Sequence, residues 1–241
     1  MIAILSDFGD SEYLGVMKAV IYDIDENAKI VDLYNKVSPQ NIKEGAWILL
    51  NSYKYFKKGT IFLCVVDPGV GTKRKCIGIK TKDYFFVGPD NGLMFPAAKE
   101  NGIKKVVNLP TKQASKTFHG RDVFAKAAVL LERGEKIESL GKEIKRIKGL
   151  NFYKLGRRGE IVRIDEFGNI ITNLESLNKK RYKLIIKNKE MYIDFFKTYG
   201  EAPSDRLFLI KGSSGTLEIS LKNDSAIKKL KVKVGDKIEI L

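Results

Sequence analysis

The sequence has few of the residues that bind metals or form disulfides. Its 241 residues include one histidine, His119, and two cysteines, Cys64 and Cys76, with no CxxC pair. Structural zinc sites take four ligands from cysteine and histidine, so this set argues against zinc or another transition metal. Two scattered cysteines also suit a reducing compartment better than a disulfide-stabilised fold. We therefore expect no metal site.

Long hydrophobic runs are also missing. No stretch reaches membrane-spanning length, and the N-terminal MIAILSDFGD meets its first acidic residue at Asp7, too early for a secretory signal peptide. These features predict a cytoplasmic protein with no membrane partner. A sizeable core is still possible, because hydrophobic residues make up 44% of the chain.

Negative charge is in the minority, and the formal net charge of +15 raises a nucleic-acid hypothesis. The excess is spread evenly, with +8 in residues 1–150 and +7 in residues 151–241. The sequence has no basic arm, zinc finger or RNP-type aromatic motif. This distribution favours a lysine-rich solvated surface, and we expect no nucleic-acid partner. A non-enzymatic nucleoside- or RNA-binding module stays open as an alternative, since fold alone does not exclude it.

The first 150 residues alternate strand and helix patterns. The run TIFLCVV at 60–66 is continuously apolar, as in a strand buried on both faces of a parallel sheet. The alternation predicts a layered α/β domain over residues 1–150 with a mostly parallel sheet. Strands are expected at 2–5, 29–33, 60–66, 76–81, 84–88 and 104–109, and helices at 11–24, 42–56 and 120–133.

After a linker at about 151–157 the pattern changes to short strands joined by Gly, Asn, Asp and Ser. No long helical pattern separates them, apart from a helical turn near 226–230. Residues 158–241 are therefore predicted to form a small all-β barrel or sandwich. The expected strands are EIVRID (160–165), YKLII (182–186), LFLIKG (207–212), TLEISL (216–221) and KIEIL (237–241).

Three polar clusters lie at predicted strand ends, where ligands bind in parallel α/β sheets. Asp7, in SDFGD, either accepts hydrogen bonds from the vicinal hydroxyls of a ribose or caps the following helix. A turn directly after the most apolar strand holds Asp67, and a glycine loop could bring Arg74 back toward it. His119 precedes a predicted helix, whose dipole disfavours imidazolium. The histidine is a metal ligand, a proton-transfer group or a side chain that merely packs.

Two further polar stretches lie in the β region. DEFGNIITN contains Asp165 and Asn169 around a Phe-Gly turn, and GSSGTLEIS contains Ser213 and Glu218. Either stretch is consistent with ordinary hairpin chemistry. A ligand that contacts both regions of the chain would explain them better than chance turns.

Six motifs, in order, resemble the SAM hydroxide adenosyltransferase family and its archaeal members in particular. They are SDFG followed by YLGVMK, VVDPGVGxxR, VGPDNGL, TFHGRDVFAKAA, DxFGNIITN and GSSGTLEIS. Family members hydrolyse S-adenosyl-L-methionine to adenosine and L-methionine. They are related to the fluorinase and chlorinase, which attack the same carbon with halide. The resemblance implies such a hydrolase, with no cofactor, assembled as a homotrimer. It places the active site between the N-terminal domain of one subunit and the C-terminal domain of the next.

The resemblance also implies residue roles. Asp67, Arg74 and His119 match the family's set for water activation, with His119 as proton acceptor or water orienter and Arg74 holding Asp67 and stabilising an anionic oxygen. Asp67 binds water, a ribose hydroxyl or both, and the choice between Asp67 and His119 as final proton acceptor stays open. Asp7 matches the ribose-binding Asp, and Asp165 is expected to face the methionine amine. The positions that hold adenosine are matched by Asn169, Ser213 and Glu218.

The halogenating relatives differ at the same places. Fluorinase has a Tyr where this chain has Asp67, and a halide-binding Ser where this chain has Gly120. The sequence thus follows the hydrolase pattern, and a halide-dependent S-adenosylmethionine adenosyltransferase is the second alternative. Fluorinase also stacks a Trp on adenine where this chain reads Pro39-Gln40, so the packing of the base is not carried over.

Overall fold

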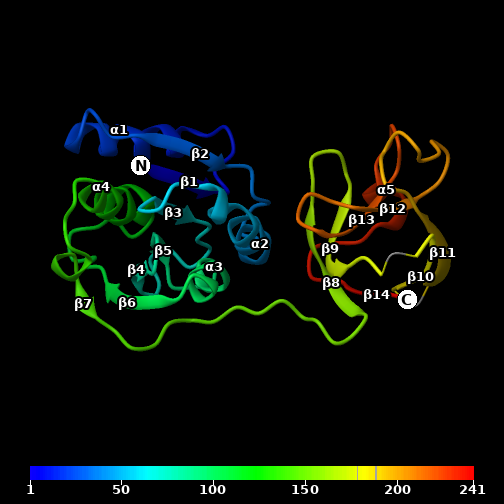
Figure 1. The fold of residues 1–241 in the computed structure, drawn as a ribbon. Coiled ribbons are helices and arrows are strands. Elements are labelled where there is room, and N and C mark those ends of the chain that lie inside the picture. The colour runs from blue at the N-terminus through cyan, green and yellow to red at the C-terminus, as the bar shows by residue number, and fades with distance from the viewer. Residues whose placement is uncertain (178, 188) are drawn as a thin grey trace. The chain divides into compact units, whose positions relative to one another are not determined.

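The computed structural model describes residues 1–177, 179–187 and 189–241, and it divides into two compact units, Met1–Leu150 and Asn151–Leu241 (Figure 1). The first unit is built on a sheet with the strand order β2-β1-β3-β5-β4-β6-β7. Its strands are β1 (Ile2–Ser6), β2 (Ile30–Tyr34), β3 (Ile61–Val65), β4 (Cys76–Thr81), β5 (Phe85–Pro89), β6 (Ile103–Asn108) and β7 (Lys142–Glu143).

This sheet is parallel in one half and antiparallel in the other. β2, β1, β3 and β5 run parallel, whereas β4 is antiparallel to β5 and β6, and β7 is antiparallel to β6. The reversal at β4 has a simple cause. Only residues 82–84 join β4 to β5, and so short a connection can close a hairpin but not a parallel crossover. The predicted α/β class is confirmed, with a mixed sheet.

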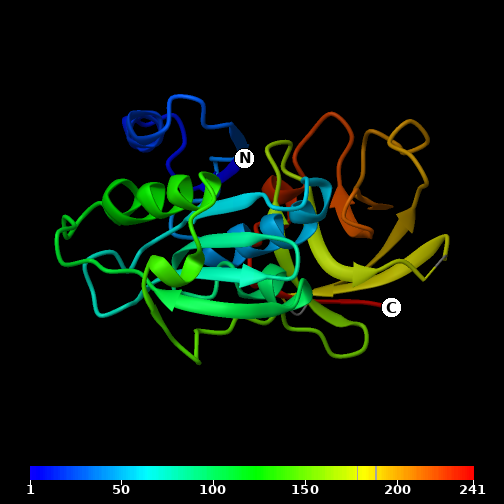
Figure 2. The ribbon, with the colours of Figure 1, turned by 60° about the vertical axis from the view of Figure 1, so that its left-hand side comes forward.

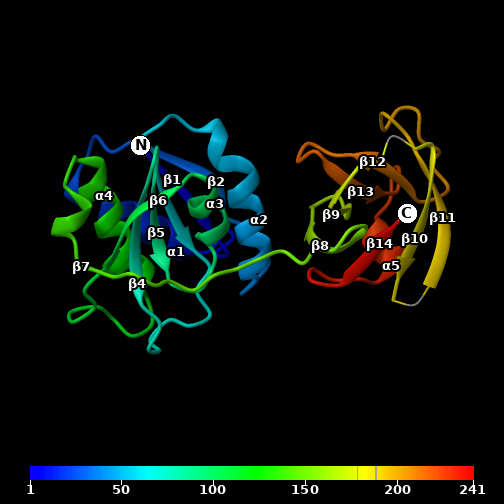
Figure 3. The ribbon, with the colours of Figure 1, turned by 60° about the horizontal axis from the view of Figure 1, so that its bottom comes forward.

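Helices cover both faces of the sheet, as Figures 2 and 3 show. Alternate side chains of β3 explain the layering. Ile61, Leu63 and Val65 join a buried cluster with side chains of α1 and α4, while the intervening Phe62 stacks on Phe86. α2 and α3 pack against each other. The helices of this unit are α1 (Glu12–Ile24), α2 (Ile42–Ser52), α3 (Phe95–Glu100) and α4 (Lys126–Glu132), with the 3₁₀ turns η1 (Tyr53–Tyr55) and η3 (Ile137–Ser139).

The helix predicted over residues 120–133 begins in an unexpected form. Residues Gly120–Ala125 form a π-helix, η2, which runs directly into α4. His119 is its N-cap residue, as expected from the sequence. π-helices are rare and are frequently found at functional sites, so this irregularity directs attention to the side chains at its start.

The second unit is a closed barrel with the strand order β10-β11-β12-β13-β9-β8-β14. It closes where β10 pairs with β14, and β11 and β12 pair in parallel. The all-β prediction is confirmed as a barrel. Its elements are β8 (Arg158–Ile164), β9 (Ile170–Glu175), β10 (Arg181–Ile186), β11 (Lys189–Phe195), β12 (Phe208–Lys211), β13 (Thr216–Ser220), α5 (Ala226–Leu230) and β14 (Lys237–Ile240).

Two of these strands differ from the sequence-based expectation. The sequence predicts only a polar stretch around a turn in DEFGNIITN, but its second half belongs to β9, and the sequence predicts no strand where β11 lies. Two of the three polar residues of β9, Thr172 and Asn173, are buried and hydrogen-bonded, whereas Glu175 at its end is exposed. The Thr172 hydroxyl donates to the Leu217 carbonyl (2.8 Å), and the Asn173 amide donates to the Tyr153 carbonyl (2.8 Å). Among the described residues, no helix is long and apolar enough to cross a membrane.

Candidate active site

The polar clusters of the first unit meet at one edge of its sheet. Asp7 follows β1 and Asp67 follows β3, and these strands are parallel neighbours, so their carboxyl ends lie side by side. Together with His119, both carboxylates line a cavity of about 460 Å³. The wall is completed by Phe8, Ser11, Tyr13, Pro39, Gln40, Val65, Pro68, Val70, Thr117, Phe118 and Gly120.

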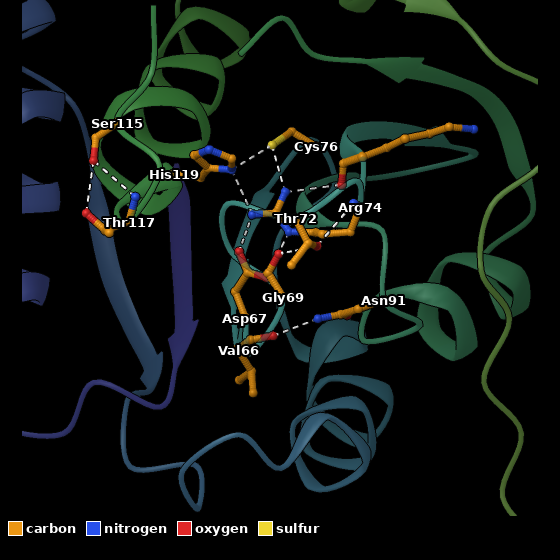
Figure 4. Close-up of polar contacts among 11 residues, drawn as sticks. Val66, Asp67, Gly69, Thr72, Arg74, Cys76, Asn91, Ser115, Thr117 and His119 are labelled. Atoms are coloured by element: carbon orange, nitrogen blue, oxygen red, sulfur yellow. Dashed lines mark hydrogen bonds and ion pairs between the residues drawn. The ribbon is translucent and has the colours of Figure 1, made fainter. Parts of the chain in front are cut away.

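The loop after β3 folds back on itself, as its glycines suggested. Backbone bonds from Val70 to the Asp67 carbonyl (3.3 Å) and from Thr72 to the Gly69 carbonyl (3.2 Å) close two consecutive turns. They return Arg74 to Asp67, where its Nε donates to Oδ1 (2.8 Å) and its Nη2 to Oδ2 (Figure 4). The two side chains are 9% and 7% exposed, so this is a buried bidentate ion pair.

His119 joins this pair from the start of the π-helix. Its Nδ1 lies 2.8 Å from Arg74 Nη2, and the residue is buried. Burial lowers the pKa of the imidazole below its usual 6.5, and the neighbouring guanidinium lowers it further, against the opposing effects of Asp67 and Asp122. The ring is therefore neutral at pH 7.

Cys76 is a member of the cluster that sequence reasoning missed. It is the first residue of β4, and its Sγ lies 2.8 Å from Arg74 Nη1 and 3.4 Å from His119 Nδ1 (Figure 4). Burial raises the pKa of its thiol, with an opposing effect from Arg74. The one available signal was its place two residues after Arg74, but cysteine in a sequence is ordinarily weighed as a disulfide or metal ligand.

Asp7 also lines the cavity, and it is held by the loop that contains Gln40. Its Oδ2 accepts a hydrogen bond from the Gln40 backbone (2.8 Å), and burial raises the pKa of the carboxyl. The capping alternative is wrong, because the N-cap of α1 is Ser11. The Ser11 hydroxyl oxygen is buried in the cavity wall without a hydrogen-bond partner among the described residues.

The candidate residues of the second unit line a separate cavity of about 1140 Å³. Asp165 Oδ2 accepts from the Asn169 amide (2.9 Å), and its Oδ1 accepts from the Asn169 backbone (2.8 Å), so the two residues brace one turn. Ser213 is also in the wall. Burial raises the pKa of Glu218, and the Asp165 charge raises it further. Tyr199, which no sequence pattern singles out, donates a hydrogen bond from its hydroxyl to Glu218 Oε2 (3.4 Å).

Gly71 lets the loop after β3 approach the backbone of Lys116, just before His119 in the chain. Its φ is +76°, and a Cβ there would lie 2.4 Å from the Lys116 carbonyl oxygen, close to His119 in the chain. We expect Gly71→Ala to destabilise this unit by about 1–3 kcal/mol and to reduce activity, because the loop must move away from Lys116. Fluorescence of Trp47, the only tryptophan, measures unfolding of this unit during urea titration.

Gly102→Ala is the matched control for this prediction. Gly102 has a similar φ of +80°, but a Cβ there would meet nothing within 4 Å. Both variants place an alanine in the left-handed backbone conformation, which is strained. Only Gly71→Ala also displaces a neighbouring backbone segment. Equal losses of stability in the two variants would contradict the importance of the Lys116 contact.

Comparison with known proteins places the chain among close relatives. Its residues 2–141 match the SAM hydroxide adenosyltransferase N-terminal domain, and residues 159–239 match the C-terminal domain of the same family. A protein from Methanocaldococcus jannaschii named (R)-S-adenosyl-L-methionine hydrolase is 38% identical, covering 100% of this chain and 95% of its own. A protein of the same name from Thermus thermophilus is 33% identical over 98% of each chain.

Solved structures and more distant relatives agree with this grouping. The crystal structure of a conserved protein from Thermotoga maritima has a TM-score of 0.93 and 36% identity, covering 100% of both chains. A fluorinase from Actinopolyspora mzabensis is only 22% identical and covers 74% of this chain. The two family domains, in order along the chain, and full-length relatives at 38% and 33% identity show that the chain belongs to the SAM hydroxide adenosyltransferase family.

Proposed function

We propose that this protein hydrolyses S-adenosyl-L-methionine to adenosine and L-methionine. The observation that carries the proposal is the Asp67 carboxylate, held by Arg74 at a cavity that Asp7 and His119 also line. Full-length relatives named (R)-S-adenosyl-L-methionine hydrolase support the same substrate. A carboxylate oriented by Arg74 beside a neutral histidine at a cavity wall is the kind of arrangement that activates water.

The reaction is an in-line displacement at the C5′ carbon of the ribose. The oxygen of water forms a bond to C5′ while the C5′–S bond breaks, and the bonding electron pair stays on sulfur, which leaves as the neutral thioether of methionine. Water loses one proton in the process. The developing hydroxide charge and the sulfonium charge partly cancel, so a site that removes bulk water favours the transition state. Positioning the two reactants supplies up to about 7–11 kcal/mol in favourable cases.

The cavity residues have complementary tasks in this mechanism. Asp67 accepts a hydrogen bond from the attacking water, and Asp7 accepts hydrogen bonds from the ribose hydroxyls. Phe8, Tyr13 and Phe118 form a cluster of ring contacts with centroids 5.2–6.0 Å apart in the same wall, and aromatic faces attract a cation such as sulfonium. In the second unit Asp165 suits the methionine ammonium group. Adenosine is held by Asn169, Ser213 and Glu218.

Incubation with S-adenosyl-L-methionine in ¹⁸O-labelled water tests the function directly. We expect adenosine and methionine in equal amounts, with the label at O5′ of adenosine and no loss of activity in the presence of a chelator. A 5′-halogenated nucleoside formed only when halide is added would indicate the halide-dependent alternative. Binding of adenosine without turnover would indicate a nucleoside-binding module.

Acid is expected to inactivate the enzyme through His119. Because burial and Arg74 lower the pKa of this histidine, it is half protonated only at a pH below 6.5, and its protonation places a second positive charge against the guanidinium. The free energy of unfolding is expected to fall with decreasing pH for the same reason. The contribution of the neutral ring is complete above pH 6.5 and is lost as pH falls toward the lower folded-state pKa. The kcat/KM profile should therefore fall on the acid side with an apparent pKa below 6.5.

His119→Asn is the control for this profile, because its side-chain oxygen still accepts a hydrogen bond and does not titrate. Its acid limb should move to lower pH, where the raised pKa of Asp7 takes over. An unchanged limb in His119→Asn would assign the titration to another group.

A homotrimer in the cytoplasm completes the proposal. Two free, buried cysteines suit a reducing compartment. The adenosine-binding and water-activating candidates occupy different units, which suits a site assembled from two subunits. If so, mixing inactive Asp67→Ala chains with inactive Asn169→Ala chains should restore part of the activity. Failure to recover activity in mixed trimers verified by mass spectrometry would show that each chain carries a complete site.

A further inference from the structure

The Arg74 guanidinium has an acceptor for each of its N–H groups. Arginine carries five such groups, and it cannot accept a hydrogen bond. Nε and Nη2 donate to the two oxygens of Asp67, and Nη2 also lies 2.8 Å from His119 Nδ1. Nη1 donates to the Lys75 carbonyl (3.3 Å) and to Cys76 Sγ (2.8 Å). Within residues 1–150, all of which the structure describes, the set of five is complete.

A guanidinium whose five N–H groups all have protein acceptors has no free donor for the nucleophile. Asp67 and His119 line the cavity, whereas Arg74 and Cys76 are outside its wall. The sequence led us to expect that Arg74 stabilises an anionic oxygen, but each of its donors already has a protein acceptor. Its influence on the reaction therefore passes through the two cavity residues that it holds.

The same contacts decide which ring nitrogen of His119 carries the proton. Since Arg74 only donates, Nδ1 must be the acceptor of the 2.8 Å contact. The Cys76 sulfur lies 3.4 Å from the same nitrogen. The proton of the neutral ring is therefore on Nε2. The imidazole also makes a hydrogen bond with the Ser115 backbone that favours its protonated form, as a ring N–H does when it donates to a carbonyl.

We propose that Cys76 is a positioning residue, whose sulfur completes the acceptor set of Arg74 and thereby holds His119 as the tautomer with its proton on Nε2. Neither Cys76 nor Arg74 touches the substrate in this arrangement. The catalytic consequence rests on the proposed function. A second ring proton would have to enter at Nδ1, facing the guanidinium, so His119 donates hydrogen bonds and the proton of water passes to Asp67.

The single histidine makes the tautomer measurable without assignment. Protein labelled with ¹⁵N-histidine gives the two ring nitrogen signals of His119 alone. At neutral pH we expect Nε2 at the shift of a protonated nitrogen and Nδ1 at that of an unprotonated one. A proton on Nδ1 in the folded protein would overturn the proposal. This measurement needs no substrate, so it decides the tautomer even if the proposed hydrolysis is wrong.

Three cysteine variants test the role of the thiol. Cys76→Ala should lower kcat about tenfold with little change in KM, the order expected for losing one hydrogen bond to a charged group, and should move the Nδ1 signal toward the protonated value. Cys76→Ser keeps an acceptor and should recover most of the activity and the wild-type signals. Cys64→Ala truncates the other buried cysteine, which is outside the cluster, and should change neither.

Two results would contradict this role. One is wild-type ring signals in Cys76→Ala, and the other is an equal loss of kcat in Cys64→Ala, which would indicate nonspecific loosening of the core. If Cys76→Ala fails to fold, Cys76→Ser and the wild-type spectrum still decide the proposal.

Discussion

Asp67→Asn is expected to lower kcat by about 10²–10⁴-fold while leaving the protein folded. The amide has the shape of the carboxylate but accepts a proton poorly, and this range is the usual contribution of a positioned general base. Adenosine affinity should change only a few-fold, because the ribose is assigned to Asp7. Single-turnover assays by chromatography, together with calorimetric titration of adenosine, separate the two effects.

Asp83→Asn is the control for this variant. Asp83 also pairs with a cation, Lys58, at 2.9 Å, but it is absent from the wall of the cavity that Asp7, Asp67 and His119 line. Its activity should remain near that of the wild type. A turnover of Asp67→Asn within a few-fold of wild type would remove Asp67 from the role of base and return attention to His119.

Arg74→Met is expected to have the largest effect on stability, about 3–5 kcal/mol. It removes all five guanidinium hydrogen bonds and leaves the Asp67 carboxylate, 7% exposed, without its cation. The packing of the guanidinium on the Phe124 ring, 5.3 Å from its centroid, is kept in part by the methionine chain. Urea titration followed by Trp47 fluorescence measures the loss in this unit.

The double variant Asp67→Asn/Arg74→Met separates charge from packing. Replacing both members of a buried ion pair is often nearly neutral for stability. The double variant should therefore recover most of the lost stability and none of the activity. A stability loss equal to the sum of the two single variants would mean that the pair contributes no coupling energy.

Much of the fold could be predicted because its strands are either continuously apolar or strictly alternating. The strand β9 was not predicted because Thr172 and Asn173 interrupt its apolar pattern. Their burial is favourable only because the distant residues Leu217 and Tyr153 accept their hydrogen bonds. The strand β11 was not predicted because it begins with two charged residues, Lys189 and Glu190. The pairing partners of these two strands cannot be predicted from local sequence.

The candidate site was predictable to the level of residue types. Asp7, Asp67 and His119 lie at strand ends or a helix start, and such positions follow from the order of elements. The five hydrogen bonds of Arg74 do not follow from the order of elements. They depend on a loop that folds back to Asp67 and on Cys76 at the start of β4. Tyr199 lies between β11 and β12 in a segment without regular structure, so no periodicity marked it.

Closure of the barrel has a consequence for how copies of this chain can associate. A closed ring of strands presents no unpaired row of backbone N–H and C=O groups, whereas an open sheet presents two. Among the described residues, the open edges belong to β2 and to the two-residue β7. Val31 on β2 is 40% exposed. Backbone pairing between copies, in assembly or in aggregation, would therefore start at β2, and a lysine at position 31 is the change that would block it.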